Sequence, residues 1–306
     1  MISRFNNEMK LSIEGLIVAP CTPMHEDGSI NVSPIAEYAV YLKNKQCVDN
    51  IFVCGTTGEG QNLTIEERKK VGEEWVKQGR KIFKKIIIHV GAGNLAETQD
   101  LAKHATEMKA DAVAIAPPTY FKPASVQILG DYLASVAKVV PDIPVLFYHL
   151  PERTGADFAM LDLLDNVVDR IPNFAGMKFV TFNMGDFGRC QQRYGDRVTL
   201  SFGKDEALLF AALSGGTSFV GATFNYMGSL YKEMFDLFTA NDIREAMKKQ
   251  QDIQVISGIV GQHLRGVTER ISGIKLGPSR LPIAPVDEDG VEKAMKSIKS
   301  SGLMTL

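Results

Sequence analysis

Residues 174–180 read Phe-Ala-Gly-Met-Lys-Phe-Val, an apolar run that only Lys178 interrupts. The run has the length and composition of a buried β-strand. Nothing in it offers a partner to an ammonium group, and burying an unpaired charge is costly. Burial therefore favours the neutral amine, which is the nucleophile that forms a Schiff base with a carbonyl. A lysine at a strand end can instead reach solvent or pair with a carboxylate, so this stretch alone leaves both interpretations open.

Seven further apolar runs bounded by turn residues accompany this one, and together they predict eight strands. The expected strands are residues 16–19, 50–54, 85–90, 112–116, 145–148, 174–179, 198–202 and 217–221. Segments with helical spacing lie between most of them, among them 96–108, 126–139 and a helix that starts at the capping box Thr64-Ile65-Glu66-Glu67. Apolar strands that alternate with helices indicate a parallel sheet covered on its outside. Eight such units predict an α/β fold, a closed (β/α)8 TIM barrel. No strand is followed by GxGxxG, which disfavours a dinucleotide-binding fold.

The chain continues for 85 residues after the last predicted strand. Helical patterning there predicts helices at 230–239, 243–264 and 291–299. This is more than one closing helix requires. We therefore expect a barrel over residues 1–228 and a small C-terminal helical extension over 229–306, packed together as one structural unit.

Bulk composition narrows the class of protein. Of 306 residues, 45% are hydrophobic and 23% charged, and the net charge of −2 gives no electrostatic footprint for nucleic acid or an anionic membrane. Four cysteines are scattered without a CxxC pair, as is typical of reduced thiols in a cytosol. Residues 1–10 lack the apolar core of a signal peptide, and no apolar stretch approaches the ~20 residues of a membrane span. We expect a soluble, cytoplasmic protein that binds neither nucleic acid nor membrane.

Polar residues gather where the predicted strands end, which is where barrels of this kind place their chemistry. In Gly55-Thr56-Thr57-Gly58-Glu59-Gly60, two hydroxyls and bare backbone N–H groups form a nest suited to a carboxylate, or else a plain turn that caps the next helix. Tyr148 ends its strand and can relay protons, unless it is a core tyrosine. His89 and His149 belong to no zinc spacing such as HExxH, so we expect neither a metal ion nor a cofactor.

These motifs resemble the class I aldolase family of N-acetylneuraminate lyase and dihydrodipicolinate synthase. The resemblance covers residues 16 to about 225 and rests on Gly55–Gly60, Tyr148-His149-Leu150-Pro151 and Gly176-Met177-Lys178. Within the family the chain looks most like the N-acetylneuraminate lyases. Residues 52–60, 87–92, 203–206 and 221–226 carry that closer likeness.

The resemblance implies a role for each strand-end residue. Lys178 would form the Schiff base with pyruvate, Tyr148 would move the proton, and Thr56 and Thr57 would hold the pyruvate carboxylate. The hydroxyls of the sugar-derived part would face Gly203, Asp205 and Glu206. Tyr120 corresponds to an aromatic that reaches across a subunit interface, and residues 117–121 form an apolar loop of the kind that contact surfaces cover. We therefore expect a homotetramer built as a dimer of dimers.

Three positions depart from the lyase pattern. Lyases usually carry a hydroxyl two residues after the lysine, where this chain has Val180 with Thr181 next to it. They usually carry serine at the position of Ala222. Arg153 is more like the arginine of dihydrodipicolinate synthases, which binds the carboxylate of the aldehyde partner. The pyruvate half of the reaction is left intact and the second substrate becomes the open question.

The sequence thus predicts a Schiff-base lyase that splits N-acetylneuraminate into N-acetylmannosamine and pyruvate. Dihydrodipicolinate synthase, which joins pyruvate to aspartate semialdehyde, is the first alternative, together with an aldolase or dehydratase of another 2-keto sugar acid. A non-catalytic barrel that senses a keto acid and a metal-dependent class II aldolase are the alternatives from other classes.

Overall fold

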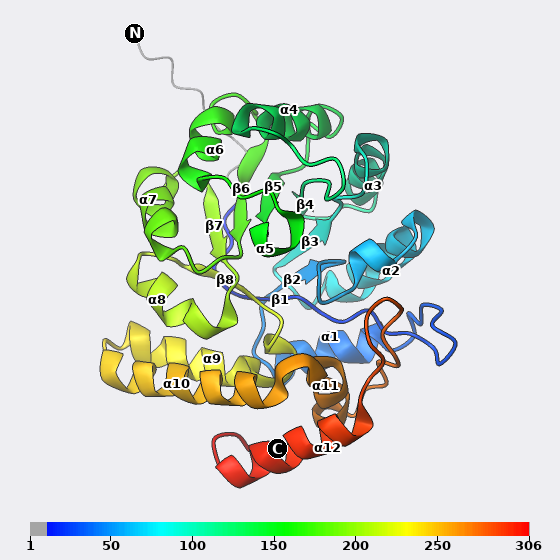
Figure 1. Ribbon diagram of the computed structural model, residues 1–306, viewed down its shortest axis with the longest axis vertical. Coiled ribbons are helices and arrows are strands. Elements are labelled where there is room, and N and C mark those ends of the chain that lie inside the picture. Colours follow the sequence, from blue (N-terminus) through cyan, green and yellow to red (C-terminus); the bar gives the residue numbers. More distant parts are fainter. Residues whose placement is uncertain (1–10, 306) are drawn as a thin grey trace.

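The computed structural model describes residues 11–305 and forms a closed barrel of eight parallel strands in the order β1 to β8 (Figure 1). β1 pairs with both β2 and β8, which closes the ring. The strands are β1 (Gly15–Val18), β2 (Asn50–Val53), β3 (Lys85–His89), β4 (Ala112–Ile115), β5 (Val145–His149), β6 (Phe174–Phe179), β7 (Thr199–Phe202) and β8 (Ser218–Gly221). All eight predicted strands are confirmed to within one residue at either end.

Helices cover the outside of the barrel because each strand leads into a helix with one apolar face. They are α1 (Ile35–Asn44), α2 (Ile65–Gly79), α3 (Leu95–Glu107), α4 (Val126–Ala137), α5 (Pro151–Thr154), α6 (Met160–Val167), α7 (Met184–Tyr194) and α8 (Leu208–Leu213). The capping box expected at Thr64 is confirmed, since its hydroxyl accepts from the Glu67 N–H and the Glu67 carboxylate accepts from the Thr64 N–H.

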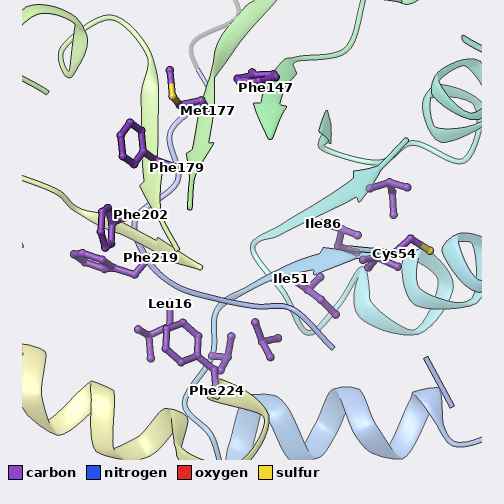
Figure 2. Packing of buried hydrophobic residues seen from close by; sticks show 14 of the residues in the cluster. Leu16, Ile51, Cys54, Ile86, Phe147, Met177, Phe179, Phe202, Phe219 and Phe224 are labelled. Atoms are coloured by element: carbon purple, nitrogen blue, oxygen red, sulfur yellow. The ribbon is translucent and has the colours of Figure 1, made fainter. Parts of the chain in front are cut away.

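The apolar residues divide between two layers according to the side of the strand they occupy. Outward residues such as Leu16, Ile51, Phe147, Phe179 and Phe202 pack against the helices in the larger layer (Figure 2). Inward residues fill the barrel in a smaller layer: Ile17, Phe52, Ile87, Ala114, Leu146 and Val220, with Leu11 and Ile13 from the segment before β1. Side-chain alternation along each strand produces this division.

Four helices follow β8, namely α9 (Phe224–Thr239), α10 (Ile243–Val260), α11 (Leu264–Ser272) and α12 (Glu288–Ser301). They lie together along one edge of the barrel (Figure 1). The expectation of one helix over 243–264 is wrong, because the chain turns at Gly261, where φ is 48°, before α11 begins. The helix expected at 230 begins at Phe224. It therefore crosses the expected boundary between the barrel and the extension, which lies after residue 228. We propose that residues 229–306 form a helical extension that makes one unit with the barrel.

Within residues 11–305 no helix combines the length and apolar character that crossing a bilayer requires. The expectation that a signal peptide is absent concerns residues 1–10, which lie outside the described residues.

Candidate active site

A bulge in β6 turns Lys178 into the barrel. The register of β6 against β5 shifts by one residue, which leaves Ala175 as an extra residue before Gly176. Gly176 has a φ of 142°, a conformation that is open to glycine and strained for other residues. A shift of one residue sends every later side chain to the opposite face. Met177 and Phe179 therefore pack on the outer layer, and Lys178 points inward.

The amine of Lys178 lies against two aromatic rings at the centre of the barrel. Its Nζ is 4.1 Å from the ring centroid of Phe52 and 4.3 Å from that of Tyr148, and the residue is 6% exposed. No carboxylate of the described residues lies within ion-pair distance of it. An amine without a carboxylate partner is free to attack a carbonyl carbon.

Tyr148 lies beside Lys178 on the neighbouring strand, and its hydroxyl faces the turn that follows β2. The Tyr148 hydroxyl is 3.0 Å from Oγ1 of Thr56, and either oxygen can donate. Its ring stands edge-on to Phe52 at 5.3 Å and to His89 at 5.4 Å between centroids. These two rings pack against the phenol, whose face lies toward the Lys178 amine and whose hydroxyl contacts Thr56.

The turn Gly55–Gly60 carries the two threonines and is bounded by two left-handed residues, Cys54 and Glu59, with φ of 56° and 55°. Gly60 donates its N–H to the Gly55 carbonyl at 3.1 Å, which closes the turn. A Cβ at Gly60 would lie 1.9 Å from the Cys54 carbonyl oxygen, so only glycine fits there. Within the described part of the chain, the backbone N–H groups of Thr56 and Thr57 have no acceptor, as an anion nest requires.

His89 is a site residue whose role the sequence did not reveal. Its Nδ1 is 2.9 Å from the Cys54 carbonyl oxygen, which can only accept, so Nδ1 carries the proton and Nε2 is an acceptor. Burial, with Arg68 adding to it, lowers the pKa of His89 to about 3, and the ring is neutral. The fixed tautomer and the neutral ring both follow from its inward position on an apolar strand. A polar residue within an apolar strand is also the signal that identified Lys178 in the sequence.

A cavity of about 250 Å³ lies at the carboxyl ends of the strands, next to the turn after β2 and beside His89 and Tyr148. Its lining residues include Thr56, His89, Tyr148, Arg153 and Ile283. Ile283 comes from the segment between α11 and α12, so the C-terminal extension contributes to the wall. The cavity has room for a small polyhydroxy acid.

The residues expected to bind the sugar-derived part lie on the loops after β6 and β7. A Cβ at Gly203 would come 3.4 Å from Cε of Lys178, which places this glycine beside the amine. Asp205 is buried, and its Oδ2 accepts from the N–H and the hydroxyl of Thr223 at 2.8 and 2.6 Å. Burial raises the pKa of Asp205 to about 6. Glu206 is half-buried and accepts from the Ser257 hydroxyl at 3.1 Å, while Thr181 is half-buried on the β6 loop.

Arg153 and Tyr120 are exposed. Arg153 lines the cavity and makes no ion pair within residues 11–305, since the carboxylate of Glu152 beside it binds Lys204 instead, at 2.8 Å. Tyr120 is 87% exposed and its ring stands edge-on to that of Phe121, 4.9 Å away. The single chain therefore brings together Lys178, Tyr148 and Thr56, and it leaves Tyr120 on the surface.

The chain matches the model of the dihydrodipicolinate synthetase family over residues 12–301. It is 40% identical to the N-acetylneuraminate lyase of Mus musculus over 298 residues, 95% of this chain and 93% of that protein. The human N-acetylneuraminate lyase gives the same identity and coverage.

Solved structures give the same result for the fold. The N-acetylneuraminate lyase of Proteus mirabilis superposes with a TM-score of 0.90 at 32% identity, covering 96% of this chain and all of that one. The lyase (sialic acid aldolase) of Aliivibrio salmonicida superposes with a TM-score of 0.91 at 29% identity, covering 96% and 99%.

Proposed function

The chain belongs to the dihydrodipicolinate synthetase family, and from this premise we propose that it is a class I carbon–carbon lyase that splits N-acetylneuraminate into N-acetylmannosamine and pyruvate. The observation that carries the proposal is the buried amine of Lys178, which lies beside the Tyr148–Thr56 pair and has no carboxylate partner among residues 11–305. The names and the similarity of the lyase relatives support this substrate over the alternatives.

The proposed reaction begins at Lys178. Its amine adds to the C2 carbonyl of the open-chain acid, and the carbinolamine takes up a proton and loses water to give an iminium ion. The C4 hydroxyl then loses its proton, the C3–C4 bond breaks, and the electron pair of that bond moves into the iminium to give an enamine. N-acetylmannosamine leaves as the aldehyde. The enamine takes up a proton at C3, and water releases pyruvate and restores the amine.

Tyr148 is proposed to move the proton of the C4 hydroxyl. Its hydroxyl is one hydrogen bond from Thr56, so it has a neighbour that can donate to the phenol oxygen or accept from it while the phenol changes roles. Thr56 and Thr57 are proposed to hold the substrate carboxylate with their hydroxyls and free N–H groups. This fixes C2 over the amine.

Gly203, Asp205, Glu206 and Thr181 are proposed to face the hydroxyls of the sugar-derived part. Gly203 leaves the space beside Lys178 open. Asp205 has one oxygen committed to Thr223, which orients the carboxylate and leaves Oδ1 to accept from a substrate hydroxyl. All the proposed steps use side chains of this chain and no cofactor.

One observation favours a second function. Arg153 lines the cavity without an ion-pair partner among residues 11–305, and a guanidinium is a planar fork suited to a carboxylate. N-acetylmannosamine has no carboxylate, whereas aspartate semialdehyde has one. Dihydrodipicolinate synthase activity is therefore the second candidate.

We propose a cytoplasmic homotetramer, a dimer of dimers, in which Tyr120 reaches the site of a neighbouring copy. The described cysteines are free thiols, which fits a reducing compartment. An adjacent pair of aromatic rings exposed at 87% and 81% is typical of a contact surface. Light scattering at micromolar concentration is expected to give the mass of four chains, and a monomer would contradict the assembly.

The test of the function is covalent trapping. Pyruvate with borohydride is expected to label Lys178 irreversibly, because reduction converts the imine into a stable amine. Peptide mapping locates the adduct, and assays with sialic acid and with aldehydes plus pyruvate identify the substrate. A protein that forms no adduct would be a keto-acid sensor, and one that a chelator inactivates without any adduct would be a class II aldolase.

A further inference from the structure

The turn that carries Thr56 and Thr57 is held in a strained conformation at both of its ends. Cys54 and Glu59, the residues at its two ends, both adopt left-handed backbone angles without being glycine. Such residues persist only where their surroundings hold them in place. The Cys54 end is held by the His89 ring, which donates to its carbonyl at 2.9 Å.

The Glu59 end is held by an arginine from the C-terminal extension. The side chains of Glu59 and Arg265 are 4% and 8% exposed, and Nη2 of Arg265 donates to Oε1 of Glu59. The other carboxylate oxygen accepts from the backbone N–H of Arg280 at 3.1 Å. Glu59 therefore has both oxygens bound by residues that lie more than two hundred positions away in the sequence.

Arg265 reaches the turn by a second route. Its Nη1 donates to the Thr22 carbonyl at 3.0 Å, and the Thr22 hydroxyl donates to the Gly58 carbonyl at 2.6 Å. The same Nη1 also donates to the Leu276 carbonyl at 2.9 Å. One guanidinium thus fixes Glu59 directly and Gly58 through Thr22, the two residues that follow the threonines.

We propose that Arg265 is a positioning residue for substrate binding, which sets the carboxylate-binding turn through Glu59 and Thr22. This inference rests on the proposed function and names what α11 adds to it. Arg265 then favours keto acids over neutral ketones, because the turn binds the carboxylate that only a keto acid carries. A purely structural ion pair would affect both classes of ketone alike.

The variants must remove the contact without leaving a buried charge unpaired. Glu59→Gln combined with Arg265→Met removes both charges and keeps side chains of similar size, which buried ion pairs often tolerate. Arg265→Lys keeps the positive charge and loses the forked geometry. Arg270→Met is the matched control, because Arg270 lies on the same helix and pairs with Glu288 in solvent.

The measurement is the rate at which borohydride traps an adduct on Lys178, with pyruvate and with hydroxyacetone, a neutral ketone. A misplaced binding group is expected to slow trapping by pyruvate about 10-fold to 100-fold in the double variant. Trapping by hydroxyacetone should stay within about 2-fold, because this ketone never engages the turn. The KM for pyruvate should rise in the synthetic direction while kcat changes little, and Arg270→Met should match the wild type.

Each result has one meaning. Equal slowing with both ketones, or no slowing with either, overturns the assignment of Arg265. Should the double variant fail to give folded protein by circular dichroism, Arg265→Lys carries the test, and a wild-type ratio of the two trapping rates overturns the assignment. Absence of any adduct on Lys178 in the wild type instead removes the proposed function itself.

Discussion

The two halves of the site are built differently. The pyruvate half consists of Lys178, Tyr148 and the turn after β2, all on strands or braced by buried hydrogen bonds. The sugar half consists of Gly203, Asp205, Glu206 and Thr181, which follow the ends of β6 and β7 and, apart from the buried Asp205, are half-buried. Arg153, on α5, is exposed. Reacting groups must be held within a fraction of an ångström, whereas specificity tolerates variation in loops. This difference is consistent with the departures from the lyase pattern, at Val180, Ala222 and Arg153, which leave the turn, the tyrosine and the lysine themselves unchanged.

The comparison predicts that Lys178→Met has the largest effect. Loss of a covalent nucleophile is expected to lower kcat by at least about 10⁴-fold, on the scale measured for other covalent enzymes. The variant should form no borohydride adduct and should still bind pyruvate weakly through the turn. Isothermal titration with pyruvate and steady-state kinetics check both statements.

Lys232→Met is the matched control, because Lys232 lies on α9 and pairs with Asp236 in solvent. It should leave kcat unchanged. Substantial turnover by Lys178→Met would move the chemistry to another residue and remove the distinction between the two halves.

Tyr148→Phe is expected to have the next largest effect. Removing a proton-transferring hydroxyl should lower kcat about 10²–10⁴-fold, while the imine on Lys178 can still be trapped, though more slowly. Single-turnover kinetics with borohydride trapping separate the two steps.

Tyr132→Phe serves as the control for loss of a tyrosine hydroxyl, since its hydrogen bond to Thr98 at 2.8 Å lies outside the barrel. A Tyr148→Phe enzyme with near-wild-type turnover would show that Tyr148 is a core residue.

The sequence predicts those parts of the site that local patterns determine, and it does not predict those that depend on contacts between distant residues. Apolar runs between turn residues located all eight strands, and one cation in such a run singled out Lys178. The bulge at Ala175 depends on how β6 pairs with β5, so no pattern within β6 reveals it. The Arg265–Glu59 pair joins positions 206 residues apart, and nothing local to either residue predicts the other. The sequence did not predict the break between α10 and α11 at Gly261, because the apolar pattern continues through Gly261 into α11.

Asp205→Asn is expected to act on the sugar half alone. Because burial raises the pKa of Asp205 to about 6, its carboxylate is charged above that pH and protonated below it. A hydrogen bond to a charged acceptor contributes about 1.5–3 kcal/mol, compared with about 0.5–1.5 kcal/mol for a bond between neutral groups. The KM for sialic acid in the wild type should therefore rise as the pH falls through about 6.

In the Asp205→Asn variant that KM should already be high at pH 7.5 and should not change across this range. The amide that replaces the carboxyl group does not titrate there, and its oxygen can still accept from Thr223. The rate of trapping by pyruvate should match the wild type at every pH. A fall in pyruvate trapping would place Asp205 in the other half of the site.

Arg153→Ala is expected to have the smallest effect, and it decides between the two candidate functions. Arg153 is exposed and forms no ion pair within residues 11–305, so its removal leaves no buried charge behind. Sialic acid uses its single carboxylate at the turn, and N-acetylmannosamine offers the guanidinium no anion. The kcat/KM for sialic acid cleavage should therefore fall by less than about 3-fold, as for loss of a solvent-exposed polar contact. Lys204→Ala, which removes another cation near this segment, is the control and should also leave kcat/KM nearly unchanged. Efficient condensation of pyruvate with aspartate semialdehyde in the wild type, abolished in Arg153→Ala and without sialic acid cleavage, would instead establish the synthase, because only that substrate brings a second carboxylate to the guanidinium.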